Sequence, residues 1–145
     1  VTLQESAMEP TYSVSEKFFV NRALYKVSSP KRGDVIVFKT SASDSAALHI
    51  RRVIGLPGET VQVKDGKIYI NGKVYEENGA YQDMTDGGLA NSAITLESGE
   101  YFVLGDNRNN SEDSRFSDIG NISKKYIVGK VWFTVSPKNK IGFIK

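Results

Sequence analysis

The side chains best suited to chemistry lie in a polar run, residues 106–115, which follows a predicted buried strand and a glycine. The run contains three acids, two arginines, three asparagines and two serines. Acids and arginines recur two positions apart, a spacing that places both members on one side of an extended chain. The two pairs of opposite charge are Asp106 with Arg108 and Asp113 with Arg115. We therefore predict two ion pairs that hold a rigid turn and fix a neighbouring group.

A calcium-binding loop is the first alternative for this run. Such a loop carries oxygen ligands at alternate positions and a glycine at the sixth. Counted from Asp106, the third position is Arg108 and the sixth is Ser111. The cation among the ligands and the missing glycine exclude a calcium loop. Ser111 is then the hydroxyl that this rigid turn presents.

Composition limits the classes of function. A chain of 145 residues, 39% of them hydrophobic, is long enough for one domain with its own core. The 19 basic and 17 acidic residues give a net charge of +2, which is too balanced to indicate a nucleic-acid partner. Cysteine is absent and His49 is the single histidine, so disulfides and thiolate or histidine-rich metal sites are excluded. We expect neither a metal nor an organic cofactor.

Runs of β-branched and aromatic residues predict a mostly β fold with at most one or two short helical turns. Two strong hairpin signals, Asp65-Gly66 and Asn71-Gly72, separate three of the strands. The polar stretch 79–98 is expected to be a loose, mobile flap. The predicted strands are 1–4, 18–20, 35–38, 48–54, 61–63, 67–70, 73–75, 101–104, 126–135 and 141–144.

Four segments, in this order, resemble the bacterial type I signal peptidases, membrane-anchored serine proteases that remove signal peptides. Residues 7–11, Ala-Met-Glu-Pro-Thr, stand where the family has Ser-Met-x-Pro-Thr, and residues 32–35 match its Arg-Gly-Asp-Val strand. Residues 51–59 match Lys-Arg-Val-Ile-Gly-x-Pro-Gly-Asp except at the two ends. Residues 105–115 match Gly-Asp-Asn-Arg-x-x-Ser-x-Asp-Ser-Arg at every specified position. The resemblance implies a signal peptidase β core with a smaller hairpin subdomain inserted at residues 60–98.

The family's mechanism uses a serine nucleophile, a neutral lysine base and a second serine hydroxyl that orients the lysine. By resemblance these roles fall on Ala7, Arg51 and Ser111, and only Ser111 is the family's residue. A methyl group cannot attack a carbonyl, and arginine, with a pKa above about 12, has almost no neutral form at pH 7. Glu5 stands where members have a small residue beside the oxyanion site, and a carboxylate there repels a developing oxyanion.

The residues that support this site, called the frame below, match the family's pattern, so the resemblance implies an intact fold around a chemically inactive centre. The supporting residues are Gly105, Asp106, Arg108, Ser111, Asp113 and Arg115.

Two interpretations of Arg51 remain open. It is either a surface cation or a side chain that fills the vacated site and pairs with an acid such as Glu5. A shifted dyad of Ser6 and His49 is the alternative catalytic hypothesis. It requires a one-residue slip, because Ser6 points away from the side of position 7 in an extended chain. Met8 is open to lipid contact or to ordinary packing.

Three functions are compatible with the resemblance. The first is a non-catalytic protein that binds an extended peptide, a signal peptide or a pilin subunit; similar members lacking both dyad residues accompany Gram-positive pilus gene clusters and assist pilin polymerisation. The second is an active signal peptidase whose dyad was deliberately changed at Ala7 and Arg51. The third is an active protease that uses the Ser6–His49 dyad.

Location is also inferred from the resemblance. No signal peptide is visible, and no window approaches the roughly 18 apolar residues that a membrane span requires. The chain begins at Val1 without a methionine. We expect a single extracytoplasmic domain, residues 1–145, from which an N-terminal membrane anchor has been removed. The full protein would then sit on the outer face of a bacterial cell membrane.

Overall fold

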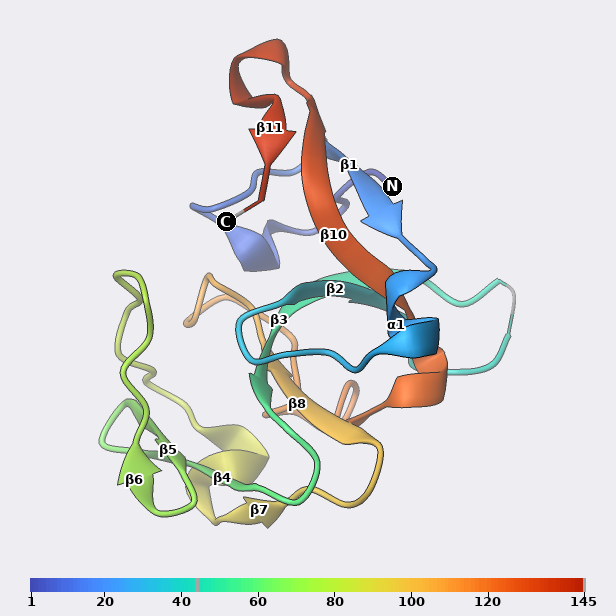
Figure 1. Ribbon diagram of the computed structural model, residues 1–145. Helices are drawn as coiled ribbons and strands as arrows, with labels where there is room; N and C mark the ends of the chain where they lie inside the picture. The colour runs from blue at the N-terminus through green and yellow to red at the C-terminus, as the bar shows by residue number, and fades with distance from the viewer. Residues whose placement is uncertain (44, 145) are drawn as a thin grey trace.

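Two antiparallel sheets organise the computed structural model, which describes residues 1–43 and 45–144 (Figure 1). The larger sheet has seven strands in the order β1-β10-β2-β3-β8-β9, with β11 paired to β10. Its strands are β1 (Lys17–Asn21), β2 (Val35–Phe38), β3 (His49–Gly55), β8 (Glu100–Leu104), β9 (Ile122–Ser123), β10 (Ile127–Ser136) and β11 (Gly142–Phe143). The smaller sheet has four strands in the order β6-β5-β4-β7. They are β4 (Thr60–Lys64), β5 (Lys67–Ile70), β6 (Lys73–Val74) and β7 (Ile94–Thr95).

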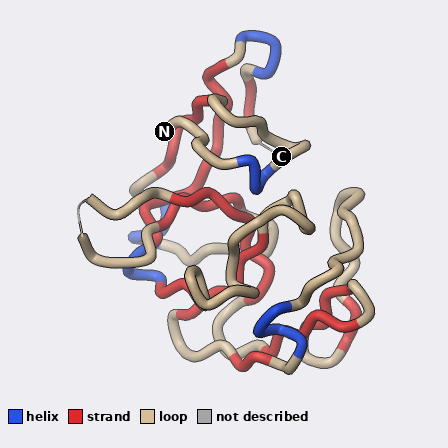
Figure 2. The backbone as a smooth tube through the Cα atoms, turned by 180° about the vertical axis from the view of Figure 1, so that it is seen from behind, coloured by secondary structure: helices blue, strands red, loops and turns tan. Residues whose placement is uncertain are grey.

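Helical structure in the described ranges is limited to short turns between the strands (Figure 2). They are η1 (Ser6–Met8), α1 (Leu24–Val27), η2 (Gly88–Asn91), η3 (Lys124–Tyr126) and η4 (Lys138–Lys140). Across residues 1–43 and 45–144, none of the helices is long and apolar enough to cross a membrane. The predicted mostly β fold with antiparallel pairing is confirmed.

The hairpins of the smaller sheet form where the two glycine-containing pairs predict them. Asp65 and Gly66 have φ of 53° and 78°, and Asn71 and Gly72 have φ of 51° and 80°. Two successive residues with positive φ match the right-handed twist of the adjoining strands, which is why Asp-Gly and Asn-Gly are favoured there. The turns fix the register of β5 between β4 and β6.

Three local expectations were wrong. Residues 1–4 form no strand, and only an isolated bridge joins Thr2 to Lys17. The stretch 79–98 is not loose, because it contains η2 and β7 and buries Ala90 and Leu96. Met8 is fully buried in a cluster with the strands of the larger sheet, so it packs in the core and does not contact lipid.

One apolar cluster joins the two sheets. From the larger sheet it takes Ile54, Phe102 and Leu104, and from the region of the smaller sheet it takes Val61, Val63, Ile68, Met84, Ala90 and Leu96. Because residues 60–98 share this core with β3 and β8, the smaller sheet has a fixed base on the larger one. The division into a core and an inserted subdomain at residues 60–98 remains a proposal.

We predict that Phe102→Ala destabilises the protein by about 3–5 kcal/mol, because it removes a fully buried ring from the cluster that joins the sheets. Urea unfolding measures the loss. The control Leu89→Ala removes a half-exposed side chain and should change the unfolding free energy by no more than about 0.5 kcal/mol. Equal effects of the two changes would contradict a shared core.

Candidate functional site

Ala7, Arg51 and Ser111 meet at one cavity of about 350 Å³, although they come from three separate segments. Ala7 lies in the turn η1, Arg51 in the centre of β3, and Ser111 in the polar turn after β8. The full lining is Glu5, Ser6, Ala7, Arg51, Asn109, Asn110, Ser111, Glu112 and Phe116. The three positions on which the resemblance places nucleophile, base and orienting hydroxyl therefore line one cavity, with the first two carrying other residues than the family's.

Gly105 allows the polar turn to approach η1. A Cβ atom at this position would lie 2.1 Å from Ser111 Oγ and 2.6 Å from the Ala7 carbonyl oxygen, so no other residue fits without a shift. The same carbonyl of Ala7 accepts a hydrogen bond of 2.8 Å from the Asn107 amide. The Asn107 side chain also donates to the Ser6 carbonyl, at 3.2 Å. These contacts fix the backbone of η1 against the turn.

Arg51 fills the site. Its residue exposure is 1%, and its Nη1 donates to Glu5 Oε2 at 2.6 Å. Its Nε donates to the Glu112 carbonyl at 2.7 Å, and Nη1 also donates to the Ile50 carbonyl at 2.7 Å. Of the two interpretations drawn from the sequence, the surface cation is wrong and the buried cation paired with Glu5 is confirmed.

Glu5 is held ionised by two neighbours. Burial raises the pKa of its carboxyl, but hydrogen bonds and charges from His49 and Arg51 outweigh this and lower the pKa from 4.5 to about 2. Glu5 Oε1 lies 3.1 Å from His49 Nδ1. The acid therefore carries a full negative charge at neutral pH and compensates the buried guanidinium of Arg51.

The edge of β3 beside the cavity is not covered by a neighbouring strand. Val53 donates its amide to Asp34 and accepts from Gly33, so the bonding groups of Val53 face β2. Because the backbone N–H and C=O groups of successive residues point to opposite edges of a strand, those of Ile50 face away from β2. There β8 pairs only with Arg52, Val53 and Gly55. The Ile50 carbonyl at this open edge is occupied by the Arg51 guanidinium.

The predicted ion pairs of the polar turn are half correct. Asp113 and Arg115 form the expected bidentate pair, with both N–O distances 2.9 Å. Asp106 does not pair with Arg108. Its two oxygens accept from Arg52 Nε and Nη2 at 2.8 and 2.7 Å.

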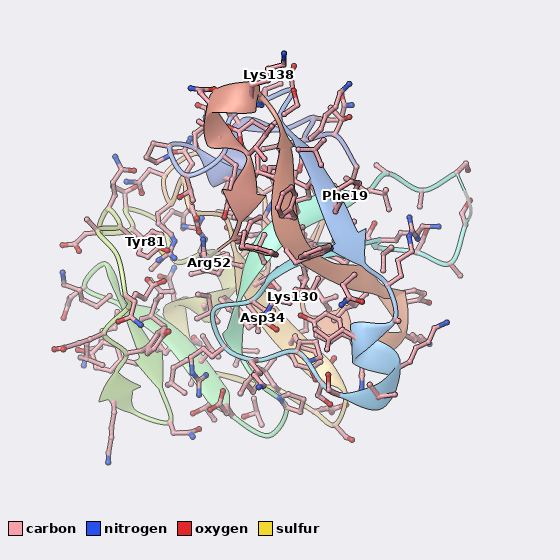
Figure 3. All side chains as sticks on the ribbon, turned by 45° about the horizontal axis from the view of Figure 1, so that its top comes forward. Phe19, Asp34, Arg52, Tyr81, Lys130 and Lys138 are labelled. Carbon is pink, nitrogen blue, oxygen red and sulfur yellow. The ribbon has the colours of Figure 1, made fainter. Side chains whose placement is uncertain are left out.

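Arg108 instead reaches the region of the smaller sheet. Its guanidinium binds both oxygens of Glu77, the Nη2–Oε2 distance being 2.7 Å, and lies 4.1 Å from the centre of the Tyr81 ring. Tyr81 also lies beside Arg52, whose guanidinium carbon is 6.0 Å from the centre of the Tyr81 ring. Figure 3 shows these two residues near each other. The frame is thus assembled across chain segments that are distant in sequence, and the two-residue spacing of Asp106 and Arg108 does not determine their partners.

Four further residues belong to this frame and were not predicted from the sequence: Arg52, Glu77, Tyr81 and Asn107. Alternation along a strand places Arg52 on the face opposite Arg51, but nothing in the sequence indicates Asp106 as its partner. Glu77 and Tyr81 lie near the start of a stretch expected to be loose, and no local spacing connects them to Arg108.

The structure brings together no intact pair of nucleophile and base at the cavity. The Ser111 hydroxyl is buried and has no hydrogen-bond partner among the described residues. Ser6 belongs to a 3-10 turn, not to an extended segment, and its hydroxyl makes no hydrogen bond with His49 in the described part of the chain. His49 is turned towards Glu5 instead. The shifted Ser6–His49 dyad therefore has no support from this geometry.

Comparisons with known proteins give the family context. The family described as "Signal peptidase, peptidase S26" matches residues 1–136. The probable signal peptidase I-2 of Synechocystis sp. is 32% identical over 98% of this chain and 65% of its own length. Signal peptidase I of Leptolyngbya laminosa is 38% identical over 97% of this chain and 70% of its own length. Signal peptidase I T of Bacillus subtilis is 36% identical over 96% of this chain and 74% of its own length.

A solved structure agrees with these relatives. The crystal structure of a signal peptidase I from Enterococcus faecalis V583 is 32% identical and superposes with a TM-score of 0.54. The match covers 70% of this chain and 96% of that one. The chain thus spans about two thirds to three quarters of the length of the three relatives above.

We predict that the stability contributed by Glu5 is pH-dependent. Its folded-state pKa is lowered from 4.5 to about 2, so this stability is fully present above 4.5 and is lost as pH falls through about 2. The difference in unfolding free energy between the wild-type protein and Glu5→Gln should be largest above pH 4.5 and shrink towards pH 2. Urea titrations across this range measure it. Glu97→Gln, an exposed control, should show no such trend.

We also predict that Asp106→Asn costs about 3 kcal/mol or more, because it leaves the largely buried Arg52 guanidinium without a counter-charge. Asp118→Asn is the matched control, since Asp118 is exposed and makes no ion pair in the described structure. Thermal and urea unfolding report both. If Asp106→Asn were as mild as the control, the frame would not depend on this pair.

Proposed function

This chain belongs to the signal peptidase family, peptidase S26, and from that premise we propose that it is a member without peptidase activity. We propose further that it retains the family's cleft and uses it to bind extended segments of secreted polypeptides, pilin subunits among them, and so assists surface assembly or secretion. The observation that carries the proposal is the buried ion pair of Arg51 and Glu5 at the positions where the reaction needs a neutral base and a small residue.

The chemistry is absent for two separate reasons. Ala7 has no atom that can attack a carbonyl, and loss of the nucleophile alone costs on the order of a million-fold in rate in a comparable protease. Arg51 cannot accept a proton from a hydroxyl, because its guanidinium remains charged near neutral pH. The ionised Glu5 adds a negative charge beside the cavity, and this charge opposes the oxyanion that forms during peptide cleavage.

The alternative, an active signal peptidase with a deliberately altered dyad, accounts less well for Glu5. A change of lysine to arginine made to abolish activity needs no third substitution. Here Glu5 contacts the Arg51 guanidinium at 2.6 Å and also approaches His49. Two of the three departures from the family pattern, Glu5 and Arg51, act together, because a buried arginine is tolerated only with a counter-charge.

Peptide binding is proposed from the open edge of β3. An extended segment can add to such an edge by main-chain hydrogen bonds, and pockets beside the edge then select its side chains. The Ile50 carbonyl that an added strand would use is occupied by Arg51 Nη1. A bound segment must therefore displace the Arg51 contact or form its hydrogen bonds on either side of Ile50. We expect it to bind more weakly than in a cleft with a shorter side chain at position 51.

The remaining parts of the proposal concern location. We propose an extracytoplasmic domain tethered to the bacterial membrane by an N-terminal anchor that precedes Val1. The support is the relatives' names as signal peptidases and their greater length. Which secreted or pilin segment binds depends on the side chains of the cavity, whose lining includes Glu5, Glu112, Asn109 and Asn110.

We predict that restoring the family residues restores cleavage only if Glu5 is also removed. The wild-type protein and Ala7→Ser/Arg51→Lys should both leave a fluorogenic peptide carrying Ala-x-Ala uncut, because Glu5 would hold a lysine at position 51 protonated. Adding Glu5→Ser should raise cleavage by about a thousandfold or more above the wild-type background. The assay is run in detergent micelles or lipid, with anisotropy of a labelled peptide measured in parallel.

The controls separate chemistry from binding. Arg51→Lys/Glu5→Ser retains Ala7 and should bind the peptide without cutting it. Cleavage by the wild-type protein itself would refute the proposal, and Ser6→Ala would then identify the nucleophile. Failure of the triple variant both to bind and to cut would mean that the cleft no longer accepts an extended peptide.

A further inference from the structure

Charge is distributed very unevenly along this chain. Residues 17–39 and 121–140 together contain eleven basic residues and one acidic residue. The rest of the chain contains eight basic and sixteen acidic residues. The basic stretches form β1, α1, β2, β9, η3, β10 and η4 (Figure 1). Of their strands, β1, β10 and β2 are neighbours in the larger sheet, whereas the short β9 pairs with β8. A molecule with a net charge of only +2 therefore has one strongly positive part.

The acid within these stretches is already neutralised. Asp34 accepts a hydrogen bond of 2.6 Å from the Tyr25 hydroxyl and lies 3.3 Å from Lys130 Nζ. Figure 3 shows Asp34 close to Lys130 of β10. Arg32 and Lys140 pair with acids from outside these stretches, Glu59 and Glu16. The remaining cations form no ion pair among the described residues, so their mutual repulsion favours a bound counter-ion.

Four of these cations line one cavity of about 460 Å³. Arg22 precedes α1, Lys26 lies within α1, Lys39 follows β2, and Lys125 lies in η3. The remaining lining is Ser41, Ala42, Tyr126, Ile127 and Val128, so no acidic side chain lines the cavity in the described part of the chain. None of the four cations forms an ion pair among the described residues, whereas Arg32, Arg51, Arg52, Arg108 and Arg115 all do.

The segments that line this cavity are fixed by hydrogen bonds of their backbone groups and by one aromatic contact. The Lys39 amide donates to the Tyr126 carbonyl at 3.0 Å, which joins the end of β2 to η3. Asn21 Oδ1 accepts from the amides of Ala23 and Leu24 and so fixes the start of α1 next to Arg22. Lys125 Nζ lies 5.1 Å from the centre of the Tyr126 ring. Lys26 and Lys125 lie in α1 and η3, and Arg22 and Lys39 lie close to the ends of α1 and β2, so the cations can close around an anion at little cost in backbone order.

We propose that this cavity binds a phosphate group. A compact anion with several oxygens can accept from one guanidinium and three ammonium groups at once, and the Ser41 and Tyr126 hydroxyls offer neutral donors beside them. A carboxylate would satisfy fewer of the donors, because it has fewer oxygens and a smaller charge. The site is separate from the cavity around Ala7 and does not depend on whether the protein cleaves peptides.

The phosphate can belong to a soluble molecule or to the headgroup of an anionic lipid. Calorimetry at low salt with inorganic phosphate and pyrophosphate tests the first source. Co-sedimentation with vesicles of phosphatidylglycerol in phosphatidylcholine, against vesicles of phosphatidylcholine alone, tests the second. Binding in one arm only identifies the source, and both arms use the full 145-residue chain.

Two double variants distinguish a specific phosphate site from general electrostatic attraction to the positive part. Arg22→Gln/Lys125→Gln removes two cations from the cavity, and Lys17→Gln/Lys138→Gln removes two exposed cations from the same basic part but outside the cavity. We expect the first to weaken phosphate binding by roughly tenfold or more and the second by no more than about twofold. Unfolding midpoints should stay the same, since all four side chains are exposed.

Two results would overturn the proposal. One is equal weakening by the two double variants, which would show that the positive part attracts anions without a site. The other is the absence of binding by the wild-type protein in both the soluble and the vesicle arm.

Discussion

The burial of four guanidinium groups is the constraint on which the arrangement of this protein depends. Arg51, Arg108 and Arg115 are 1–2% exposed and Arg52 is 9% exposed. Each must have a carboxylate, because an unpaired buried charge costs several kcal/mol. The partners come from the N-terminal segment, the region of the smaller sheet and the polar turn after β8. Arg51 and Arg52 tie the N-terminal segment and the polar turn to β3, and Arg108 ties the polar turn to the region of the smaller sheet. The same ion pairs therefore neutralise the buried charges and position the cavity.

This constraint explains how the centre could lose its chemistry and keep its shape. A lysine that acts as a base must be neutral and needs no acid beside it. An arginine in the same place is permanently charged, and the structure supplies Glu5 at 2.6 Å together with the carbonyls of Glu112 and Ile50. The substitution is compatible with folding only because these acceptors surround it. In the proposed non-catalytic member, the condition that the residues of this cavity satisfy is charge neutrality, not proton transfer.

How far the sequence predicts the structure depends on the range of each interaction. The Asp113–Arg115 pair and the two hairpins follow from residues within a few positions of one another, and these predictions were confirmed. The partners of Asp106 and Arg108 depend on strand order and on where residues 75–81 return, and neither is encoded by local spacing. The Arg51–Glu5 pair spans 46 positions. This pair could be predicted, as one of two interpretations of Arg51, only because the resemblance to the signal peptidases places both residues at one site.

The close approach at Gly105 has a consequence for how proteins of this kind are classified. The glycine is required because Ser111 Oγ and the Ala7 carbonyl leave no room for a side chain. That requirement comes from packing and remains whatever residue occupies position 7. The same holds for Asp113 and Arg115, whose pairing is structural. A search that scores these motifs alone therefore cannot separate a catalytic member of the family from a non-catalytic one. Assignment has to inspect positions 5, 7 and 51 separately, since packing alone accounts for the surrounding pattern.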